Sequence, residues 1–537
     1  MSTRSISNRT RLLVDVAMGR TPADLVIRNG RWVCVQSGEI IPNTDIAIKG
    51  ERIAYVGPDA SHTLGDNTKI VDAADQYLVP GLLDAHMHIE SGQVTVTEFV
   101  RAVIPHGTTG MFVDPHEIAN VFGLRGVKLM VDEAARQPIH VWVQMPSCVP
   151  SSPGLETPGA SLGPEDVAEA MTWPGIIGLG EMMNFPGVFN ADEKMHAEIA
   201  ETRAAGKVIG GHYAASDLGI PFHGYVAGGP EDDHEGTRME DAVARVRQGM
   251  KAMLRLGSAW HDVAEQIRAV TEMGLNPRHF ILCTDDSHAG TLVNGGHINR
   301  VVRHAIEQGL PPITAIQMAT LNTAEHFGVA RDVGMIAPGR YADILLVSNL
   351  SELRITRVFA KGRLVSENGE LLATLPAFAY PDWATQSVHL GKSPTPEDFH
   401  LPAPTLQSTN PQPMTLTANV IGVIENQAPT RHLQMQITPE GGEIKADTEC
   451  DLAKIALVER HRGTGRVQVG LVHGFGFSES CAVATTVAHD SHHLIVVGTN
   501  EADMALAANK LGAVNGGQGV VKNGEVIGLV ELPIAGL

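Results

Sequence analysis

Two histidines spaced one residue apart, His86 and His88, end an apolar run that begins after Pro80-Gly81. Alternate residues of a β-strand point to the same face, so both imidazoles can bind one metal ion. A pair of half-exposed strand histidines that bind nothing is the alternative for an isolated motif of this kind. The spacing therefore predicts a metal site only together with ligands from other parts of the chain.

Three further candidate ligands follow other short apolar runs, and a fourth lies in a charged segment. The three are Glu181 after residues 176–180, His212 after 208–211 and Asp285 after 280–284, and the fourth is His234. Four imidazoles and two carboxylates without thiolates suit two divalent ions, and the carboxylate of Glu181 can bridge them. A lone strand-end carboxylate is more often a helix cap or a turn former. That explanation would have to hold at several strand ends at once.

Metal-assisted hydrolysis is the chemistry that this set of residues predicts. A water bound to a divalent ion ionises near neutral pH, and a carboxylate beside it can take and return the proton. We assign that role to Asp285. Iron, manganese and zinc share this ligand chemistry, so the residue types leave the choice among them open.

Short apolar runs alternate with helical patterns between about residues 80 and 334. The expected strands include 109–113, 139–143, 176–179, 208–210 and 280–283, and the expected helices include 164–172, 239–256 and 299–308. A (β/α)8 barrel takes about 250 residues, and its active site lies where its strands end. A doubly wound open sheet is the alternative, although no Gly-x-Gly-x-x-Gly motif follows an early strand.

Strand patterns punctuated by glycine occupy residues 23–79 and return at 342–362. They predict a small composite β-sandwich built from both flanks of the barrel. A Pro-rich, Ser-rich and Thr-rich stretch then precedes a last α+β unit. The expected α/β architecture is a TIM-like barrel at 79–337, a β-sandwich from 1–78 and 338–380, a linker or crossover at 381–413, and a C-terminal α+β domain at 414–537.

The composition limits the classes of partner that this protein is expected to bind. The 537 residues carry a formal charge of −20 at pH 7 and show no basic face for a phosphate backbone, so no nucleic acid is expected. Five scattered cysteines without a Cys-x-x-Cys pair fit a reducing cytoplasm, and no apolar run approaches the ~18 residues of a membrane span. We therefore expect a cytoplasmic protein with a small-molecule partner, no membrane contact, and a homo-oligomeric state of two or more subunits.

The residues around the histidine pair resemble a known family. The run 80–91 is similar to the first-strand signature of the amidohydrolase superfamily, and Asp114-Pro115-His116-Glu117-Ile118-Ala119-Asn120 resembles the adenine deaminases within it. Residues 180–184, 233–235, 283–286 and 488–492 agree with the same family. The resemblance extends over nearly the whole chain.

This resemblance implies a hydrolase with two divalent metal ions, most often manganese or iron and also zinc. The implied reaction converts adenine to hypoxanthine and ammonia in purine salvage, with a metal-bridging hydroxide as nucleophile. Carried over residue by residue, the resemblance implies that Asp285 and Glu181 are catalytic and that the metal ligands are His86, His88, Glu181, His212, His234 and Asp285. Glu90, Asp114, His116 and Glu117 are candidates for binding substrate, supplying a second acid or orienting the ligand imidazoles.

One departure from the family pattern lies beside a predicted ligand. The family typically has Asp-Gly-His, a small residue and then Pro-Gly-Leu, whereas this chain has Gly210-Gly211-His212-Tyr213-Ala214-Ala215-Ser216. The changed loop permits an amidohydrolase that acts on another amino-heterocycle or on a cyclic amide. A non-catalytic scaffold that keeps the fold is the third hypothesis, against which the complete ligand set argues.

Overall fold

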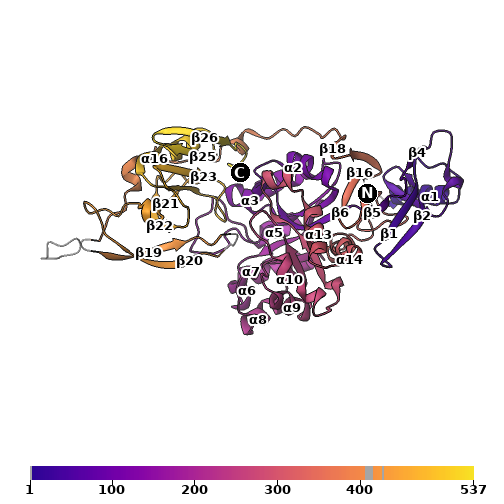
Figure 1. Ribbon diagram of the computed structural model, residues 1–537, viewed down its shortest axis with the longest axis horizontal. Helices are drawn as coiled ribbons and strands as arrows, with labels where there is room; N and C mark the ends of the chain where they lie inside the picture. The colour runs from indigo at the N-terminus through magenta and orange to yellow at the C-terminus, as the bar shows by residue number, and fades with distance from the viewer. Residues whose placement is uncertain (1–2, 405–414, 426–428) are drawn as a thin grey trace. The chain divides into compact units, whose positions relative to one another are not determined.

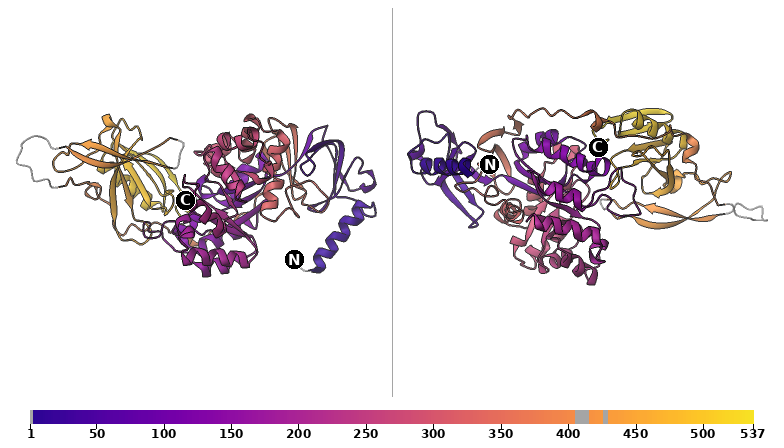
Figure 2. Two further views of the ribbon diagram at one scale, coloured as in Figure 1. Left: turned by 90° about the horizontal axis from the view of Figure 1, so that it is seen from below. Right: turned by 180° about the vertical axis from the view of Figure 1, so that it is seen from behind.

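The computed structural model describes residues 3–404, 415–425 and 429–537, and the chain forms two compact units. The first unit comprises residues 1–116, 128–148 and 162–378, and the second comprises 117–127, 149–161 and 379–537. Figures 1 and 2 trace the elements of each unit from indigo at the N-terminus to yellow at the C-terminus. The second unit thus includes two short segments that follow barrel strands of the first.

A parallel barrel forms the centre of the first unit. Its strands are β6 (Leu82–His88), β7 (Thr108–Val113), β8 (His140–Met145), β9 (Ile176–Met182), β10 (Val208–Gly211), β11 (Asp232–Asp233), β12 (Lys251–Arg255), β13 (Phe280–Cys283) and β14 (Asp285–Asp286). They form two ladders, β10-β9-β8-β7-β6-β14 and β11-β12-β13. The Glu231 amide donates to the Ile209 carbonyl at 2.9 Å and links the two ladders. The α/β barrel expected from the alternating pattern is confirmed.

Helices connect and cover the strands (Figure 1). In α13 (Ile298–Glu307), the buried residues Ile298, Val301, Val302 and Ala305 recur with helical spacing, so one apolar face packs on the barrel. The other helices of the barrel region are α2 (Val96–Val103), α3 (His116–Phe122), α4 (Leu124–Ala134), α5 (Pro164–Met171), α6 (Phe185–Phe189), α7 (Glu193–Ala204), α8 (Ile220–Gly228), α9 (Met239–Arg247), α10 (Val263–Gln266), α11 (Arg268–Thr271), α12 (Ala289–Asn294), α14 (Pro312–Met318) and α15 (Leu321–His326), with 3-10 turns η2 (Glu90–Gly92), η3 (Ile104–His106) and η4 (Pro277–His279).

The helix expected over residues 239–256 is wrong in its second half. Helix α9 ends at Arg247, Gly249 has a φ of +91°, and β12 begins at Lys251. Glycine adopts this left-handed conformation without steric cost, so it ends the helix there. Residues 252–255 are all buried, so β12 lacks the alternation that identifies a half-exposed strand.

A register shift in β6 decides which of its side chains face the barrel interior. The pairing of β6 with β7 shifts between Asp84 and Met87, as expected of a β-bulge. Leu83, before the shift, and Ala85, within it, belong to an apolar core with Phe112, Met253, Ile281, Cys283, Ala324, Phe327 and Val333. The rings of Phe112 and Phe327 stack at 3.8 Å, so the segment after α15 closes this core. His86 lies within the shifted segment and His88 after it, and their Nε2 atoms lie 3.1 Å apart.

Strands from both flanks of the barrel pair in one nine-stranded sheet. The order is β18-β17-β16-β15-β5-β1-β2-β3, with β4 beside β1. The bounds are β1 (Leu25–Cys34), β2 (Glu39–Lys49), β3 (Arg52–Gly57), β4 (Lys69–Asp72), β5 (Tyr77–Pro80), β15 (Ile344–Asn349), β16 (Arg354–Ala360), β17 (Arg363–Glu367) and β18 (Glu370–Leu371), with η1 at Ser61–Thr63. The junction between flanks pairs Ile344 with Pro80. The composite β module is therefore present, while its exact boundaries stay a prediction.

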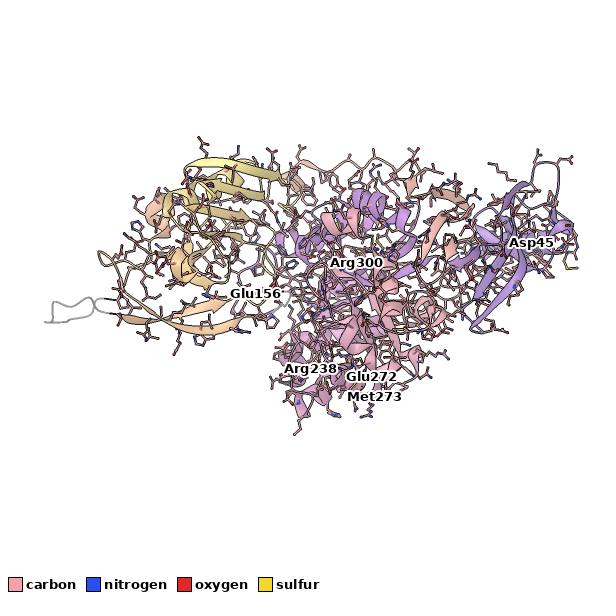
Figure 3. The ribbon with its side chains drawn as sticks, in the orientation of Figure 1. Asp45, Glu156, Arg238, Glu272, Met273 and Arg300 are labelled. Atoms are coloured by element: carbon pink, nitrogen blue, oxygen red, sulfur yellow. The ribbon has the colours of Figure 1, made fainter. Side chains whose placement is uncertain are left out.

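Two further features belong to this sheet region. Helix α1 (Thr3–Ala17) packs Val16 into a small core with Val26 and Ala47. Asp45, labelled in Figure 3, is buried and accepts hydrogen bonds from the amides of Asn29 at 3.1 Å and Ala60 at 3.0 Å. The carboxylate of Asp45 thereby connects β2 to the backbone at Asn29 and at Ala60.

The second unit has an eight-stranded sheet with the order β20-β19-β22-β21-β24-β23-β25-β26. Its elements are β19 (Leu416–Gly422), β20 (Arg431–Ile437), β21 (Leu452–Val458), β22 (Val467–His473), β23 (Cys481–Thr485), β24 (Leu494–Gly498), α16 (Glu501–Ala513), β25 (Gly517–Lys522) and β26 (Glu525–Glu531), with η7 at Thr448–Cys450. Helix α16 lies beside this sheet (Figures 1 and 2), and its Met504, Ala508 and Leu511 belong to the core that the sheet covers. The expected α+β domain is confirmed.

The expected linker at 381–413 contains the short turns η5 (Asp382–Thr385) and η6 (Pro396–Phe399), and its residues 405–413 lie outside the described residues. Across the part of the chain that the structure describes, no helix combines the length and the apolar character that a membrane crossing requires.

Candidate metal centre

The structure brings the six predicted ligands together at the carboxyl ends of the barrel strands. His86 and His88 end β6, Glu181 lies near the end of β9, and Asp285 begins β14. His212 and His234 directly follow β10 and β11. Ligand atoms lie within 4.8 Å of one another in the groups His86–His88–Glu181, His86–His234–Asp285 and Glu181–His212–His234. This end of a (β/α)8 barrel is where active sites are found.

Glu181 directs its two carboxylate oxygens at different imidazoles. Oε1 lies 3.4 Å from Nε2 of both His88 and His116. Oε2 lies 2.5 Å from His212 Nδ1 and 3.2 Å from His234 Nε2. A carboxylate that faces two groups of nitrogen ligands has the geometry needed to bridge two metal ions.

His86 and His88 converge on the other carboxylate. Their Nε2 atoms are 3.1 Å apart, and Asp285 Oδ1 lies 3.2 Å from His88 Nε2 and 3.8 Å from His86 Nε2. The His86 ring also stacks on His234, with centroids 4.0 Å apart. Nitrogen and carboxylate oxygen donors therefore crowd one buried site, and this donor set suits divalent manganese, iron or zinc ions.

A backbone contact sets the tautomer of His88. Its Nδ1 lies 2.8 Å from the Asp114 carbonyl oxygen, which can only accept a hydrogen bond. The proton of a neutral His88 is therefore on Nδ1, and the Nε2 lone pair is left to face the site. This is the arrangement of a metal-ligating histidine, so the residues present fit a metal ion.

Burial and the nearby charges shift the pKa values of the carboxyl groups in the site in different directions. Burial opposes the charge of Glu181, but His212, His234 and His88 hold its pKa well below the ordinary value. Burial likewise opposes the charge of Asp285, whose pKa is held well below its ordinary value by His88 and Arg255. For Asp114, burial and the nearby charge of Glu181 raise the pKa to about 7.

Asp114 and His116 lie beside the ligand set. Asp114 Oδ2 accepts a hydrogen bond from the Glu181 amide at 2.8 Å, in addition to the contact of its carbonyl with His88. A Cβ at position 180 would lie 2.1 Å from this oxygen, so only glycine fits there. The His116 ring lies 4.8 Å from that of His88. Asp114 therefore orients two ligands, while His116 itself reaches the carboxylate of Glu181.

Glu90 and Glu117 are the other two residues that the sequence associates with the site. Glu90 directly follows the first-strand motif in η2 and is buried. Glu117 is buried in α3 and begins a segment of the second unit, where its Oε1 lies 4.0 Å from His489 Nδ1.

Arg255 is a site residue that the sequence analysis missed. It ends β12, the strand that was expected to be helical, and it is buried. Its Nη1 lies 2.8 Å from Asp285 Oδ2 and also pairs with Glu235, while its Nε lies 2.6 Å from Asp262 Oδ2. The apolar run 251–255 after Gly249, which ends in a charged residue as 280–285 does, is the signal that could have identified it.

The altered loop after His212 is held by its own contacts. The Tyr225 hydroxyl accepts a hydrogen bond from the His212 amide at 2.8 Å, and the Arg245 guanidinium donates to the Tyr213 carbonyl at 3.0 Å. A Cβ at position 211 would lie 2.1 Å from the Asp232 carbonyl oxygen, so glycine is required immediately before the histidine. The changed sequence therefore still positions His212.

The barrel and the convergent ligands at its strand ends define an amidohydrolase, and residues 77–365 match the Amidohydrolase family. Residues 427–537 match the adenine deaminase C-terminal domain. This chain belongs to the adenine deaminase family of the amidohydrolases, as the resemblance in its motifs predicts.

The relatives support this assignment over nearly the full length. The chain is 64% identical to "Adenine deaminase 3" of Rhizobium meliloti (strain 1021), over 98% of this chain and 87% of the relative. It is 53% identical to "Adenine deaminase" of Moorella thermoacetica, over 99% of this chain and 88% of the relative. The crystal structure of an adenosine deaminase from Xanthomonas campestris with bound zinc has a TM-score of 0.51 at 14% identity, covering 66% of this chain and 95% of that one, and shows the shared fold alone.

Proposed function

We propose that this protein hydrolyses adenine to hypoxanthine and ammonia at a centre of two divalent metal ions. The observation that carries the metal centre is Glu181, whose two oxygens face separate groups of imidazoles. The choice of adenine is supported by relatives that bear the name adenine deaminase at 53–64% identity. The reaction would serve purine salvage, and the free cysteines fit the reducing cytoplasm.

The ligands divide between two positions. His86, His88, Asp285 and one oxygen of Glu181 would hold one ion, and His212, His234 and the other oxygen of Glu181 would hold the second. When bound, manganese or iron ions, or zinc with the same ligand preferences, supply the Lewis acidity that makes water a nucleophile near neutral pH. Asp114 keeps His88 and Glu181 in the required orientation through its carbonyl and its carboxylate.

Asp285 is the proposed proton carrier. Arg255 holds its Oδ2 at 2.8 Å, which leaves Oδ1 on the side of the histidines. In the reaction, water oxygen bonds to the purine carbon that carries the amine, and the carbon to amine bond breaks. Asp285 accepts one proton from the attacking water and delivers it to the leaving amine, so ammonia departs. The other water proton restores the acid that protonates the ring nitrogen, so the oxo product carries its proton on that nitrogen.

A second acid protonates the purine ring nitrogen. Glu90, His116 and Glu117 are the candidates, since all three are buried and lie within or directly after the motifs that supply the site. Replacement of each by its neutral or isosteric counterpart identifies the acid, because loss of ring protonation lowers kcat more than it changes KM.

The test is deamination of adenine by protein loaded with manganese or iron. Loss of adenine absorbance together with stoichiometric ammonia release supports the proposal, and the Glu181→Gln variant serves as the inactive control. The same protein is assayed against a panel of other amino-heterocycles and cyclic amides. Turnover confined to that panel contradicts the choice of adenine, and failure to bind any divalent ion contradicts the metal centre.

A further inference from the structure

A hollow in the first unit lies away from the candidate ligands of the metal centre. It has a volume of about 450 Å³ and is lined by Lys251, Arg278, Glu325, His326 and Arg331 together with Gly328 and Ala330. Lys251 is the first residue of β12, and Arg278 lies in η4, the turn that leads into β13. The hollow therefore opens where these strands begin, whereas the metal ligands stand where the strands end.

The charge of this hollow is positive in a strongly acidic protein. Three cationic side chains, Lys251, Arg278 and Arg331, face a single carboxylate, that of Glu325. The carboxylate is already paired with Arg278 at 3.1 Å. Among the described residues, neither Lys251 nor Arg331 forms an ion pair. With a formal charge of −20 on the whole chain, such a local excess of unpaired cations is unexpected without a ligand.

The cations are held in place by the surrounding backbone. The Lys251 ammonium donates to the Arg278 carbonyl at 2.6 Å, which uses one of its three donors. The Asn322 side chain donates to the carbonyls of Pro277 at 2.9 Å and Phe280 at 3.0 Å, and so fixes the turn that carries Arg278. Burial lowers the pKa of Lys251; the Glu325 carboxylate opposes this shift, and the nearby Arg278 charge adds to it.

His326 does not add to this charge. Its Nε2 lies 2.6 Å from Asp232 Oδ2, so the carboxylate balances the ring if the ring is protonated. The ligand that the hollow fits is therefore defined by the ammonium and the two guanidinium groups. These donors match the tetrahedral oxygens of a phosphate group, to which arginine binds in a bidentate manner and lysine as a point charge.

We infer that the hollow between Lys251, Arg278 and Arg331 is a binding site for a phosphate group, either the free ion or the phosphate of a small phosphorylated metabolite. The site is independent of the proposed reaction. Its volume lies within the usual range of small-molecule pockets, about 300–1,000 Å³, and exceeds what the free ion fills. Two probes therefore distinguish the sources, inorganic phosphate and glycerol 1-phosphate.

The test measures binding of each probe to the metal-loaded protein by isothermal titration calorimetry. Lys251→Met and Arg331→Gln should each weaken binding by about tenfold or more, because each removes one full charge from the site. Lys251→Arg should bind within about threefold of the unchanged protein, since the charge is retained. Arg101→Gln is the control, because Arg101 is exposed on α2 and pairs with Glu98.

Each outcome has one meaning. Weakened binding of both probes in the two charge-removing variants supports a site for phosphorylated metabolites, and weakened binding of inorganic phosphate alone supports a site for the free ion. Phosphate taken up by the metal centre is insensitive to these substitutions. Binding that is equal in all variants, or absent from the unchanged protein, overturns the inference. Arg331 is exposed, so its replacement keeps the test decisive even if a Lys251 variant folds poorly.

Discussion

Replacement of Arg255 by Gln should destabilise the barrel and slow the reaction together. The guanidinium is buried and contacts Asp285 at 2.8 Å, Asp262 at 2.6 Å and also Glu235. At an effective dielectric constant of about 20, one charge pair at 2.8 Å interacts by about 6 kcal/mol, and desolvation of both charges offsets part of this. Removal of one partner from a buried ion pair costs about 3–5 kcal/mol, because the remaining charges stay buried without a counter-ion.

The measurements are thermal unfolding and adenine turnover on metal-loaded protein. A loss of about 4 kcal/mol lowers the melting temperature of a unit as large as the first by roughly 5 °C. Turnover should fall about 100-fold, since a proton carrier displaced by about 1 Å loses activity on that scale. Adding Asp262→Asn to the Arg255→Gln variant should recover part of the melting temperature, because it removes one of the uncompensated charges.

Arg300→Gln is the matched control. Arg300, labelled in Figure 3, donates to the carbonyls of Leu256 at 3.3 Å and Gly257 at 3.0 Å, and it forms no ion pair among the described residues. Its replacement removes a guanidinium from the same unit without leaving a carboxylate uncompensated, at a cost of about 1–2 kcal/mol. Equal losses of melting temperature for Arg255→Gln and Arg300→Gln, or no recovery with Asp262→Asn, would refute the charge argument.

Three further predictions concern other positions. Burial raises the pKa of Glu198 to about 8, so the folded state keeps the proton of Glu198, and the free energy of unfolding falls as pH rises from 4.5 through that value. The free energy of unfolding of Glu198→Gln should therefore exceed that of the unchanged protein by up to about 5 kcal/mol at pH 9 but not at pH 4. Parallel melting curves at both pH values would contradict this. Gly180→Ala should lower metal content measured by elemental analysis, since its Cβ would lie 2.1 Å from Asp114 Oδ2; full occupancy would show that the carboxylate moves freely. Glu181→Gln and Asp285→Asn should abolish turnover while leaving the circular dichroism spectrum unchanged; near-normal turnover in either variant would show that its assigned role is wrong.

The residue types along the chain indicate most of the candidate site. His86 and His88 have strand spacing, and Glu181, His212 and Asp285 each follow a short apolar run, so local pattern alone places them at strand ends. Because parallel strands that close into a barrel bring their carboxyl ends to one rim, the convergence of these residues also follows from the predicted fold. Their roles as metal ligands stay a proposal.

Other features depend on contacts between residues that are distant in the chain. The shift in β6 that turns both the apolar core and the histidines inward arises from pairing with β7, which local periodicity does not encode. Arg255 was missed because residues 252–255 of β12 are all buried, and a helix and a strand cannot be told apart locally in such a run. Its charge acquires a function only where Asp262, Glu235 and Asp285 approach it. Periodicity thus predicts most of the elements and the residues that end them, while long-range packing identifies a buried strand such as β12 and determines the partners and electrostatic environment of each side chain.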